Sequence, residues 1–245
     1  SSDLEAVGLT AVNSINWARV MAQVVYYAVA AELLAGPIDV CVPSGNFGNV
    51  FAGWIARRAG APIDRLVVAT NANDILHRFF AANDMTAAPV VPSISPSMDI
   101  QVSSNFERLL FEMNDRDGAA TAAQLAAFRA TGTLTVTAAQ RAEYLDGTFD
   151  SARLDDVETL DVMARTYRDA GMFLDPHTAV GVGAVERLRA TGRLAHTAVT
   201  LATAHPAKFP DAVERATGVR PPLPAHLADL FEREEHLTVL PNDLA

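Results

Sequence analysis

The chain has 245 residues, of which 50% are hydrophobic and 20% charged, and its formal net charge is −10. This length and composition fit one large globular domain, and the acidic excess argues against a nucleic-acid partner. No apolar run reaches the roughly 18 residues that a membrane span needs, and the first residues lack the features of a signal peptide. The single cysteine, Cys41, lies in an apolar run. We therefore expect a packed thiol and a reducing, cytoplasmic setting.

The first predicted element is a long helix over 14–35. Apolar side chains recur there at helical spacing, Asn13 or Ser14 can cap its start, and Gly36-Pro37 follow its end. Because the apolar positions cover much of the circumference, we expect this helix to be buried.

An apolar strand over 38–42 comes next and leads into a glycine-bearing turn, 44–49, and a helix over 47–59. Such a unit points several backbone N–H groups at one spot, at the positive end of a helix dipole, which suits an anion such as a phosphate. The ending of a P-loop and the spacing of the dinucleotide fingerprint are both absent. An ordinary turn with a helix cap explains the same residues about as well.

A second buried strand is predicted over 65–70, where a near-continuous apolar and β-branched run suits a parallel sheet. A helix that ends near Ala82 follows. The Pro- and Ser-containing stretch 89–98 predicts an ordered loop or a short strand. Ser104-Asn105-Phe106-Glu107 matches a capping box, which predicts a helix through Met113.

The second half of the chain is predicted to be mostly helical. Helices are expected over 119–130, 138–145, 154–169, 207–217 and 225–235, with a short β-prone piece at 134–137. Asp175 caps a further helix that begins at Pro176 and runs to about Ala190. A third buried strand is predicted over 197–202.

Strands that alternate with helices predict an α/β fold, with an open, mainly parallel sheet flanked by helices. Residues 1–245 are predicted to form one domain that carries a mostly helical insertion at about 119–170. Ligands of such sheets lie beyond the carboxyl ends of the strands. The turn 44–49 and the segment Thr203-Ala204-His205 each follow a strand, so we expect them to share one site.

Other segments have a functional and a structural interpretation. Asp175-Pro176-His177-Thr178 opens a helix, and plain capping by Asp175 alone accounts for the Asp and the Pro. His205 can likewise be a structural histidine. The six histidines are scattered and no G-x-S-x-G elbow is present. Neither a metal site nor a Ser–His–Asp hydrolase is therefore predicted.

Taken together, six segments resemble threonine synthase, a pyridoxal-phosphate enzyme of the tryptophan-synthase-β-like class. They occur in the family's order: NSINWARVMAQVVYY (13–27), VPSGNFGNVFAGWIA (42–56), ATNANDIL (69–76), PSMDIQVSSNFERLLFE (96–112), DPHTAVGV (175–182) and ATAHPAKFP (202–210). Enzymes of this family convert O-phosphohomoserine and water to threonine and phosphate.

The resemblance also implies roles for particular residues. The coenzyme phosphate would be bound by Ser44, Gly45, Asn46, Phe47, Gly48 and Asn49. Thr203 would hydrogen-bond the pyridine nitrogen. The pocket would also include Asp175, His177, Thr178, His205 and Lys208.

The family's Schiff-base lysine lies in an upstream Phe-Lys-Asp context that is absent here. The only lysine is Lys208, in the HPAKF segment, where the resemblance implies a structural or phosphate-contacting role. The resemblance therefore implies a C-terminal portion of the enzyme that has no catalytic lysine, is inactive alone and needs the N-terminal part as its partner. An exposed apolar face is expected where that part would pack.

Two alternatives stay open at this point. One is another pyridoxal-phosphate lyase or dehydratase of the same class. The other is a non-catalytic phosphate-binding or anion-binding module that is complete as it stands.

Overall fold

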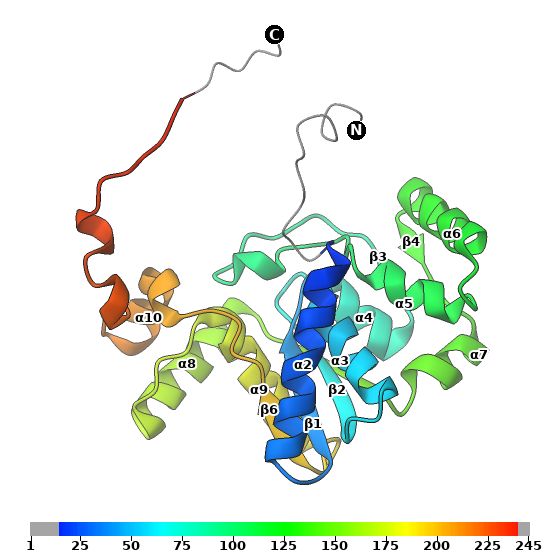
Figure 1. Ribbon diagram of the computed structural model, residues 1–245, viewed down its shortest axis with the longest axis horizontal. Helices are drawn as coiled ribbons and strands as arrows, with labels where there is room; N and C mark the ends of the chain where they lie inside the picture. The colour runs from blue at the N-terminus through cyan, green and yellow to red at the C-terminus, as the bar shows by residue number, and fades with distance from the viewer. Residues whose placement is uncertain (1–14, 240–245) are drawn as a thin grey trace.

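The computed structural model describes residues 15–239 (Figure 1). Four parallel strands form the main sheet in the order β5–β2–β1–β6. Their bounds are β1 (Ile38–Pro43), β2 (Ile63–Thr70), β5 (Phe149–Arg153) and β6 (Thr197–Thr200). The predicted α/β architecture with an open parallel sheet is thus confirmed.

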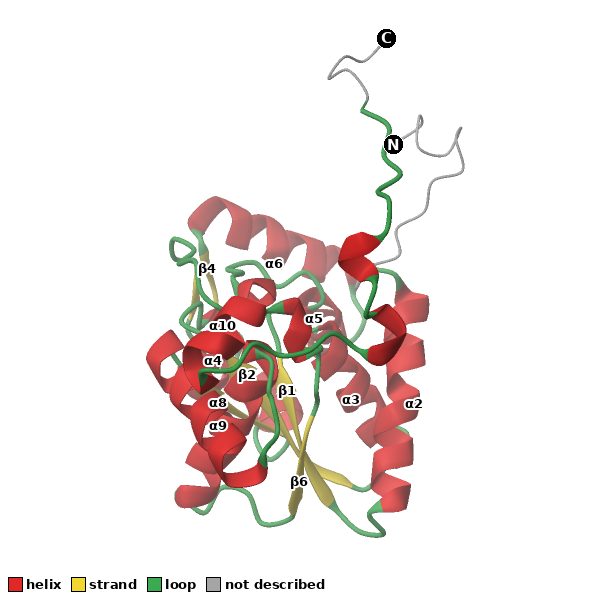
Figure 2. Ribbon diagram, turned by 90° about the vertical axis from the view of Figure 1, so that its left-hand side faces the viewer, coloured by secondary structure: helices red, strands yellow, loops and turns green. Residues whose placement is uncertain are grey.

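Helices lie on both faces of this sheet (Figure 2). One side carries α2 (Trp17–Leu33), α3 (Gly48–Arg58), α4 (Ile75–Ala82), α5 (Phe106–Met113) and α6 (Gly118–Thr131), and the other carries α8 (Asp156–Ala170), α9 (Pro176–Ala190) and α10 (Pro210–Thr217). Side chains of one strand divide between the two cores: Val40 and Val42 enter the first, and Cys41 enters the second. This alternation explains why β1 reads as a continuous apolar run.

Shorter elements complete the fold. They are the antiparallel pair β3 (Met85–Thr86) and β4 (Thr133–Leu134), the short helix α7 (Ala138–Gln140), a π-helical turn η2 (Arg141–Leu145), and 3-10 turns η1 (Pro96–Met98), η3 (Pro206–Lys208), η4 (Ala225–Leu227) and η5 (Leu230–Glu232). No helix in the described part of the chain is long and apolar enough to cross a membrane.

The helix α3 is wedged between α2 and the sheet. A Cβ atom at Gly53 would lie 2.7 Å from Tyr27 Cε1 and 2.8 Å from Leu66 Cδ2. Only glycine allows α3 to approach both neighbours so closely. This packing places α2 in an outer layer, beyond α3.

The expectation that α2 is buried is wrong. Along the helix, Met21, Val25, Val29 and Leu33 are 56%, 62%, 46% and 78% exposed, respectively. These four side chains, which we call the outer face of α2, recur every four residues and form one apolar ridge. A helix packed on a single layer can bury only one side, and neither view shows another described element over this ridge (Figures 1 and 2). The start of α2 is capped by Asn16, whose side chain accepts from Ala18 N at 2.9 Å; Asn13 and Ser14 lie outside the described residues.

Residues 119–170 are mostly helical, but they also supply β5, which the sequence did not predict. The strand contains Asp150 and Arg153, so it lacks an apolar run. It pairs with β2 at the edge of the sheet, with Asp150 opposite Val67. Asp150 is buried there because the guanidinium of Arg193 binds it and that of Arg65 lies 3.7 Å away.

Two further predictions are corrected by the structure. The strand β6 spans only Thr197–Thr200, and its residues are exposed or half-buried because it lies at the other edge of the sheet. Residues 225–235 form η4 and η5 instead of a helix. Their apolar side chains find no core, as the 85% exposure of Phe231 shows, so packing does not stabilise a longer helix.

Candidate functional site

The turn after β1 opens onto a pocket of about 640 Å³, which we call the β1–β6 pocket. It is lined by Arg19, Gln23, Tyr26, Ala30, Pro43, Ser44, Gly45, Asn46, Phe47, Gly48, Asn49, Ser97, Leu201, Ala202 and Thr203. The pocket thus lies between the carboxyl ends of β1 and β6, where ligands of open α/β sheets bind. All seven residues that the resemblance assigned to the coenzyme are brought together here.

The turn presents backbone donors at the start of α3. The first i→i−4 bond of the helix runs from Phe51 N to Phe47 O at 2.9 Å, so the amides of residues 48–50 precede the helical ladder. Phe47 itself has a φ of 63°, and its amide donates to Ser44 Oγ at 3.1 Å. The left-handed backbone there costs free energy. It is held by the Phe47 ring, which is fully buried against Phe80 and Phe106.

The segment around Ser97 packs closely against Gly45 of the turn 44–49. A Cβ atom at Gly45 would lie 3.0 Å from Ser97 O, so glycine is required by close approach of the two backbones. The segment that carries Ser97 is anchored by Asp99, whose Oδ1 accepts from Asn71 Nδ2 at 2.7 Å and from Asn73 Nδ2 at 2.9 Å. The stretch 89–98, predicted as an ordered loop or a short strand, is a loop that ends in the turn η1, and its Ser97 forms part of the pocket wall.

Two tyrosines of α2 fix Asn49. The Tyr27 hydroxyl donates to Asn49 O at 2.7 Å and lies 2.9 Å from Asn49 Oδ1, and the Tyr26 hydroxyl donates to the same Oδ1. Burial raises the pKa of Tyr26 to about 12, so its hydroxyl keeps its proton at neutral pH. With Oδ1 held by hydroxyl donors, the amide nitrogen of Asn49 is the group that can donate to a ligand.

The sequence analysis missed Ser104, which supports the turn, and Arg19, which lines the pocket. Ser104 does not form the predicted capping box, because α5 begins at Phe106 with Asn105 as its N-cap. Its hydroxyl instead donates to Asn46 Oδ1 at 3.3 Å. Arg19, on α2, is the one charged side chain among the lining residues. Ser104 is 58 residues from Asn46, and Arg19 comes from another element than the turn, so local pattern carried no signal for either.

Asp175, His177 and Thr178 lie behind the pocket and do not line it. Asp175 caps α9 as predicted, accepting from His177 N at 2.9 Å, and α9 spans the predicted Pro176–Ala190. Burial alone would raise the pKa of the Asp175 carboxyl, but hydrogen bonds from His177 and Thr178 outweigh burial and hold that pKa below its usual value. Thr178 touches the lining indirectly, since its Oγ1 accepts from Thr203 N at 3.3 Å.

His205 and Lys208 lie outside the lining of the pocket. His205 is exposed, and its Nδ1 accepts from Ala207 N at 3.2 Å, which caps η3. Lys208 is exposed as well, with Nζ 5.8 Å from the centre of the Phe209 ring. In this structure His205 therefore caps the turn η3 after β6, and Lys208 lies against the ring of Phe209 next to that turn.

The residues present fit a small phosphorylated ligand. Residues 48–50 offer backbone N–H groups, Ser44 offers a hydroxyl and Asn49 offers an amide, all around one turn at a helix N-terminus. The volume of the β1–β6 pocket lies within the usual range of cofactor sites.

Solved structures with the same arrangement are available. The chain superposes on the PLP-bound threonine synthase of Brucella melitensis with a TM-score of 0.90 and 45% identity, over 97% of this chain and 51% of that one. For the yeast threonine synthase the TM-score is 0.82, with 35% identity over 91% and 49% of the two chains. The protein therefore has the α/β fold of the type II pyridoxal-phosphate enzymes.

Sequence comparison shows which of the pyridoxal-phosphate enzymes with this fold the chain matches. Residues 178–245 match the family described as "Threonine synthase, C-terminal". The threonine synthase of Pseudomonas aeruginosa is 54% identical over 246 aligned residues, which cover 99% of this chain and 52% of the relative. The chain corresponds to the C-terminal portion of threonine synthases and spans about half the length of the curated relatives it matches.

Proposed function

We propose that this chain is the coenzyme-phosphate-binding part of a threonine synthase that converts O-phosphohomoserine and water to threonine and phosphate. The observation that carries the proposal is the meeting of Ser44–Asn49 and Thr203 in one pocket at the N-terminus of α3. The correspondence to the C-terminal portion of threonine synthases supports the reaction class. Pyridoxal phosphate, when bound, supplies an electron sink for the carbon atoms of an amino-acid substrate.

Each wall of the pocket has a role in this proposal. The amides of residues 48–50 and the Ser44 hydroxyl hold the coenzyme phosphate. Thr203 faces the pyridine nitrogen with a neutral hydroxyl instead of a carboxylate, which leaves that nitrogen unprotonated or weakly protonated. Arg19, the charged residue of the lining, suits an anionic group of the substrate.

The proposed partner is the remaining part of the enzyme. The only lysine, Lys208, lies outside the pocket lining, so the lysine that anchors the coenzyme and moves protons has to come from that part. The outer face of α2 offers it an apolar docking surface, and α2 also lines the pocket through Arg19, Gln23 and Tyr26. A partner seated on α2 would therefore reach the coenzyme site.

The proposal is tested by supplying the missing part in trans. The chain is incubated with pyridoxal phosphate and O-phosphohomoserine, alone and with the separately produced portion of the Pseudomonas aeruginosa relative that it does not match. We expect no threonine from the chain alone and threonine plus phosphate from the mixture. Threonine from the chain alone would overturn the need for a partner. A stable visible absorption band of bound coenzyme that is lost in Lys208→Ala would overturn the assignment of Lys208.

The same mixture separates the rival functions. A pyridoxal-phosphate dehydratase would release ammonia and an oxo acid from serine or threonine, and it would leave O-phosphohomoserine unchanged. A non-catalytic anion-binding module would bind phosphate and give no product with any of the three substrates. Activity with O-phosphohomoserine and not with serine or threonine is the result that the proposal requires.

A further inference from the structure

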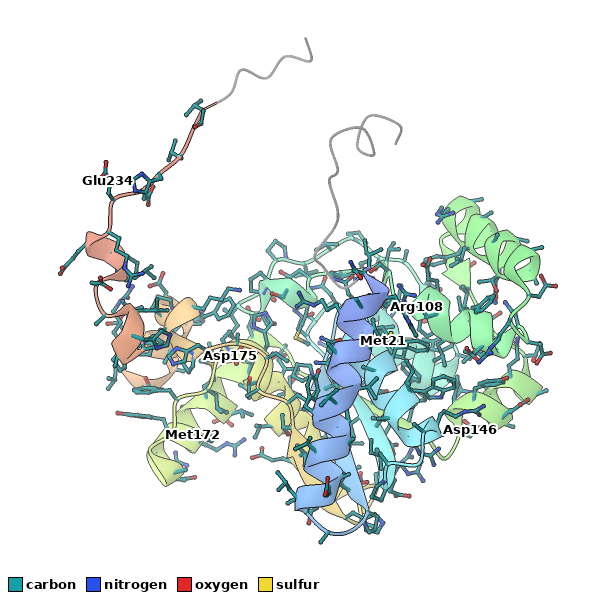
Figure 3. The ribbon with its side chains drawn as sticks, viewed as in Figure 1. Met21, Arg108, Asp146, Met172, Asp175 and Glu234 are labelled. Carbon is teal, nitrogen blue, oxygen red and sulfur yellow. The ribbon has the colours of Figure 1, made fainter. Side chains whose placement is uncertain are left out.

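Behind the β1–β6 pocket, one buried carboxylate joins two segments of its wall. Asp175, His177 and Thr178 are only 1%, 4% and 5% exposed, and Asp175 lies beside the segment that follows β6 (Figure 3). A helix cap needs only the hydrogen bonds that the Asp175 carboxylate accepts from backbone amides. Here two side chains, the His177 ring and the Thr178 hydroxyl, also donate to this carboxylate.

The first branch runs through the imidazole. His177 Nδ1 lies 3.0 Å from Asp175 Oδ1, and His177 Nε2 lies 3.2 Å from Ser97 N. An ionised carboxylate only accepts and a backbone amide only donates, so Nδ1 carries the proton and Nε2 presents its lone pair to Ser97. Ser97 and His177 are 80 residues apart in sequence. The carbonyl of Ser97 packs closely against Gly45 in the turn 44–49.

The second branch runs through the hydroxyl. Thr178 Oγ1 donates to Asp175 Oδ2 and accepts from Thr203 N at 3.3 Å. Both branches therefore lead from a backbone amide of the pocket wall to one carboxylate. The low pKa of Asp175 supports this arrangement, because the ionised form is the one that both branches need. Bonds in such a chain polarise one another and strengthen together.

We propose that Asp175 is a positioning residue that sets the distance between the two walls of the coenzyme pocket. Through His177 it fixes the backbone of Ser97 beside the turn 44–49. Through Thr178 it fixes the backbone of Thr203, the residue proposed to face the pyridine nitrogen. The inference rests on the proposed coenzyme site. It adds that the segment with Ser97 and the segment with Thr203 are held by the same carboxylate, so that their positions depend on each other.

Three substitutions separate the branches. Thr178→Val keeps the shape of the side chain and removes the hydroxyl that accepts from Thr203 N and donates to Asp175 Oδ2. His177→Phe removes both ring nitrogens, the one that accepts from Ser97 N and the one that donates to Asp175 Oδ1. Asp175→Asn keeps a capping oxygen for α9, since Asn is as good a cap as Asp, but its amide nitrogen cannot accept and so releases one of the two branches. Thr178→Ser retains the hydroxyl and is the matched control.

The positioning role is measured in the chain itself by the amide NMR signals of Ser97 and Thr203. Thr178→Val is expected to shift the Thr203 signal and not that of Ser97, His177→Phe is expected to do the reverse, and Thr178→Ser should leave both near wild type. Asp175→Asn should shift the Thr203 signal, because its capping oxygen keeps the place of Oδ1 and its amide nitrogen replaces Oδ2, the acceptor for Thr178. Changes confined to the amides of α9 in Asp175→Asn would reduce Asp175 to a helix cap and overturn the inference. If Asp175→Asn does not fold, the contrast between Thr178→Val and Thr178→Ser decides the question. An unmoved Thr203 signal in Thr178→Val would then overturn the inference.

Ligand binding gives a second and separable readout. The probes are inorganic phosphate and pyridoxine 5′-phosphate, which has no aldehyde and cannot react with a lysine. Thr178→Val should weaken pyridoxine 5′-phosphate about tenfold, the equivalent of one lost hydrogen bond, and leave phosphate unchanged. His177→Phe should weaken both probes. If the wild type binds neither probe, the proposed coenzyme site fails, while the NMR signals still decide whether Asp175 holds the two walls.

Discussion

At the residue scale, the two adjacent tyrosines of α2 differ sharply in what their hydroxyls do. Tyr27 is 1% exposed and its hydroxyl binds both oxygens of Asn49, whereas Tyr26 is 37% exposed and binds only Oδ1. Tyr27→Phe removes one donor to the Asn49 carbonyl, which still belongs to the hydrogen-bond ladder of α3. We expect it to lower the free energy of unfolding by about 1 kcal/mol, the usual net contribution of one hydrogen bond, and to weaken phosphate binding.

Tyr26→Phe is the matched control for this prediction. It removes a hydroxyl that shares its acceptor with Tyr27, so we expect a change within about 0.5 kcal/mol. Urea unfolding and phosphate titration of both variants provide the measurements. Equal effects of the two substitutions would show that Tyr27 does not position Asn49.

The residues of the turn could be predicted from sequence, and those that support it could not. Ser44–Asn49 are adjacent in the chain, so a strand, a glycine turn and a helix suffice to predict an anion site there. Ser97, Ser104 and Tyr27 reach the same place only through tertiary packing. The capping-box pattern even assigned Ser104 to its own helix, while the structure gives its hydroxyl to Asn46. A local rule was overridden by a contact 58 residues away in sequence.

At the scale of elements, α2 combines a wall of the pocket with an uncovered apolar ridge, on which Met21 is labelled in Figure 3. We expect Met21→Glu with Val25→Glu to reduce self-association of the isolated chain, because charges break the apolar patch. The free energy of unfolding should change by no more than about 0.5 kcal/mol, as is usual for exposed positions. Sedimentation velocity and urea unfolding check the two parts of the prediction.

The neighbouring Val20 supplies the control. It is 0% exposed on the same helix, so Val20→Glu buries an unpaired charge and should destabilise the chain by several kcal/mol or unfold it. A similar loss in the Met21 and Val25 double variant would mean that the outer face of α2 is covered in solution by the chain itself. Unchanged self-association of a stable double variant would remove this ridge as the docking surface.

Elements were predictable where their own residues decide them. The buried strands β1 and β2 carry continuous apolar runs, and α9 has a cap and Pro176 at its start. The strand β5 was missed because Asp150 is stabilised there by Arg193 and Arg65, which come from other parts of the chain. The burial of α2 was misjudged for the opposite reason, because its apolar residues predict a covered helix that the described chain alone does not cover.

At the scale of the whole molecule, the order of strands and helices was sufficient for the fold class, and the two-core construction emerged only from the structure. Residues of β1 and β2 alternate between the cores on opposite faces of the sheet. A continuous apolar run predicts that both faces are covered, but it does not say which helices cover each face. That division sends the turn after β1 to α3 on one face and places α9 on the other. The β1–β6 pocket is completed by α2, by Ser97 and by the segment after β6.

The single thiol makes the integrity of this two-sided packing measurable. Cys41 is 0% exposed, points from β1 into the second core, and donates from Sγ to Gly181 O of α9 at 3.3 Å. Burial raises the pKa of this thiol well above its ordinary value of 9.0. The folded chain therefore keeps the proton at a pH where the unfolded chain releases it, so the unfolded state binds fewer protons above about pH 9.

Stability should accordingly fall as the pH rises above about 9, by about 1.4 kcal/mol per pH unit from this group alone. Below that pH the thiol is protonated in both states and contributes no slope. Urea unfolding between pH 8 and pH 10 measures the slope, and Cys41→Ala, which cannot ionise, should lack this contribution. A thiol reagent at pH 8 provides the second check, since modification of a fully buried sulfur requires separation of β1 from α9 and should follow the unfolding equilibrium as urea is added. Rapid modification of the native chain, or equal slopes in wild type and Cys41→Ala, would show that the second core opens without unfolding.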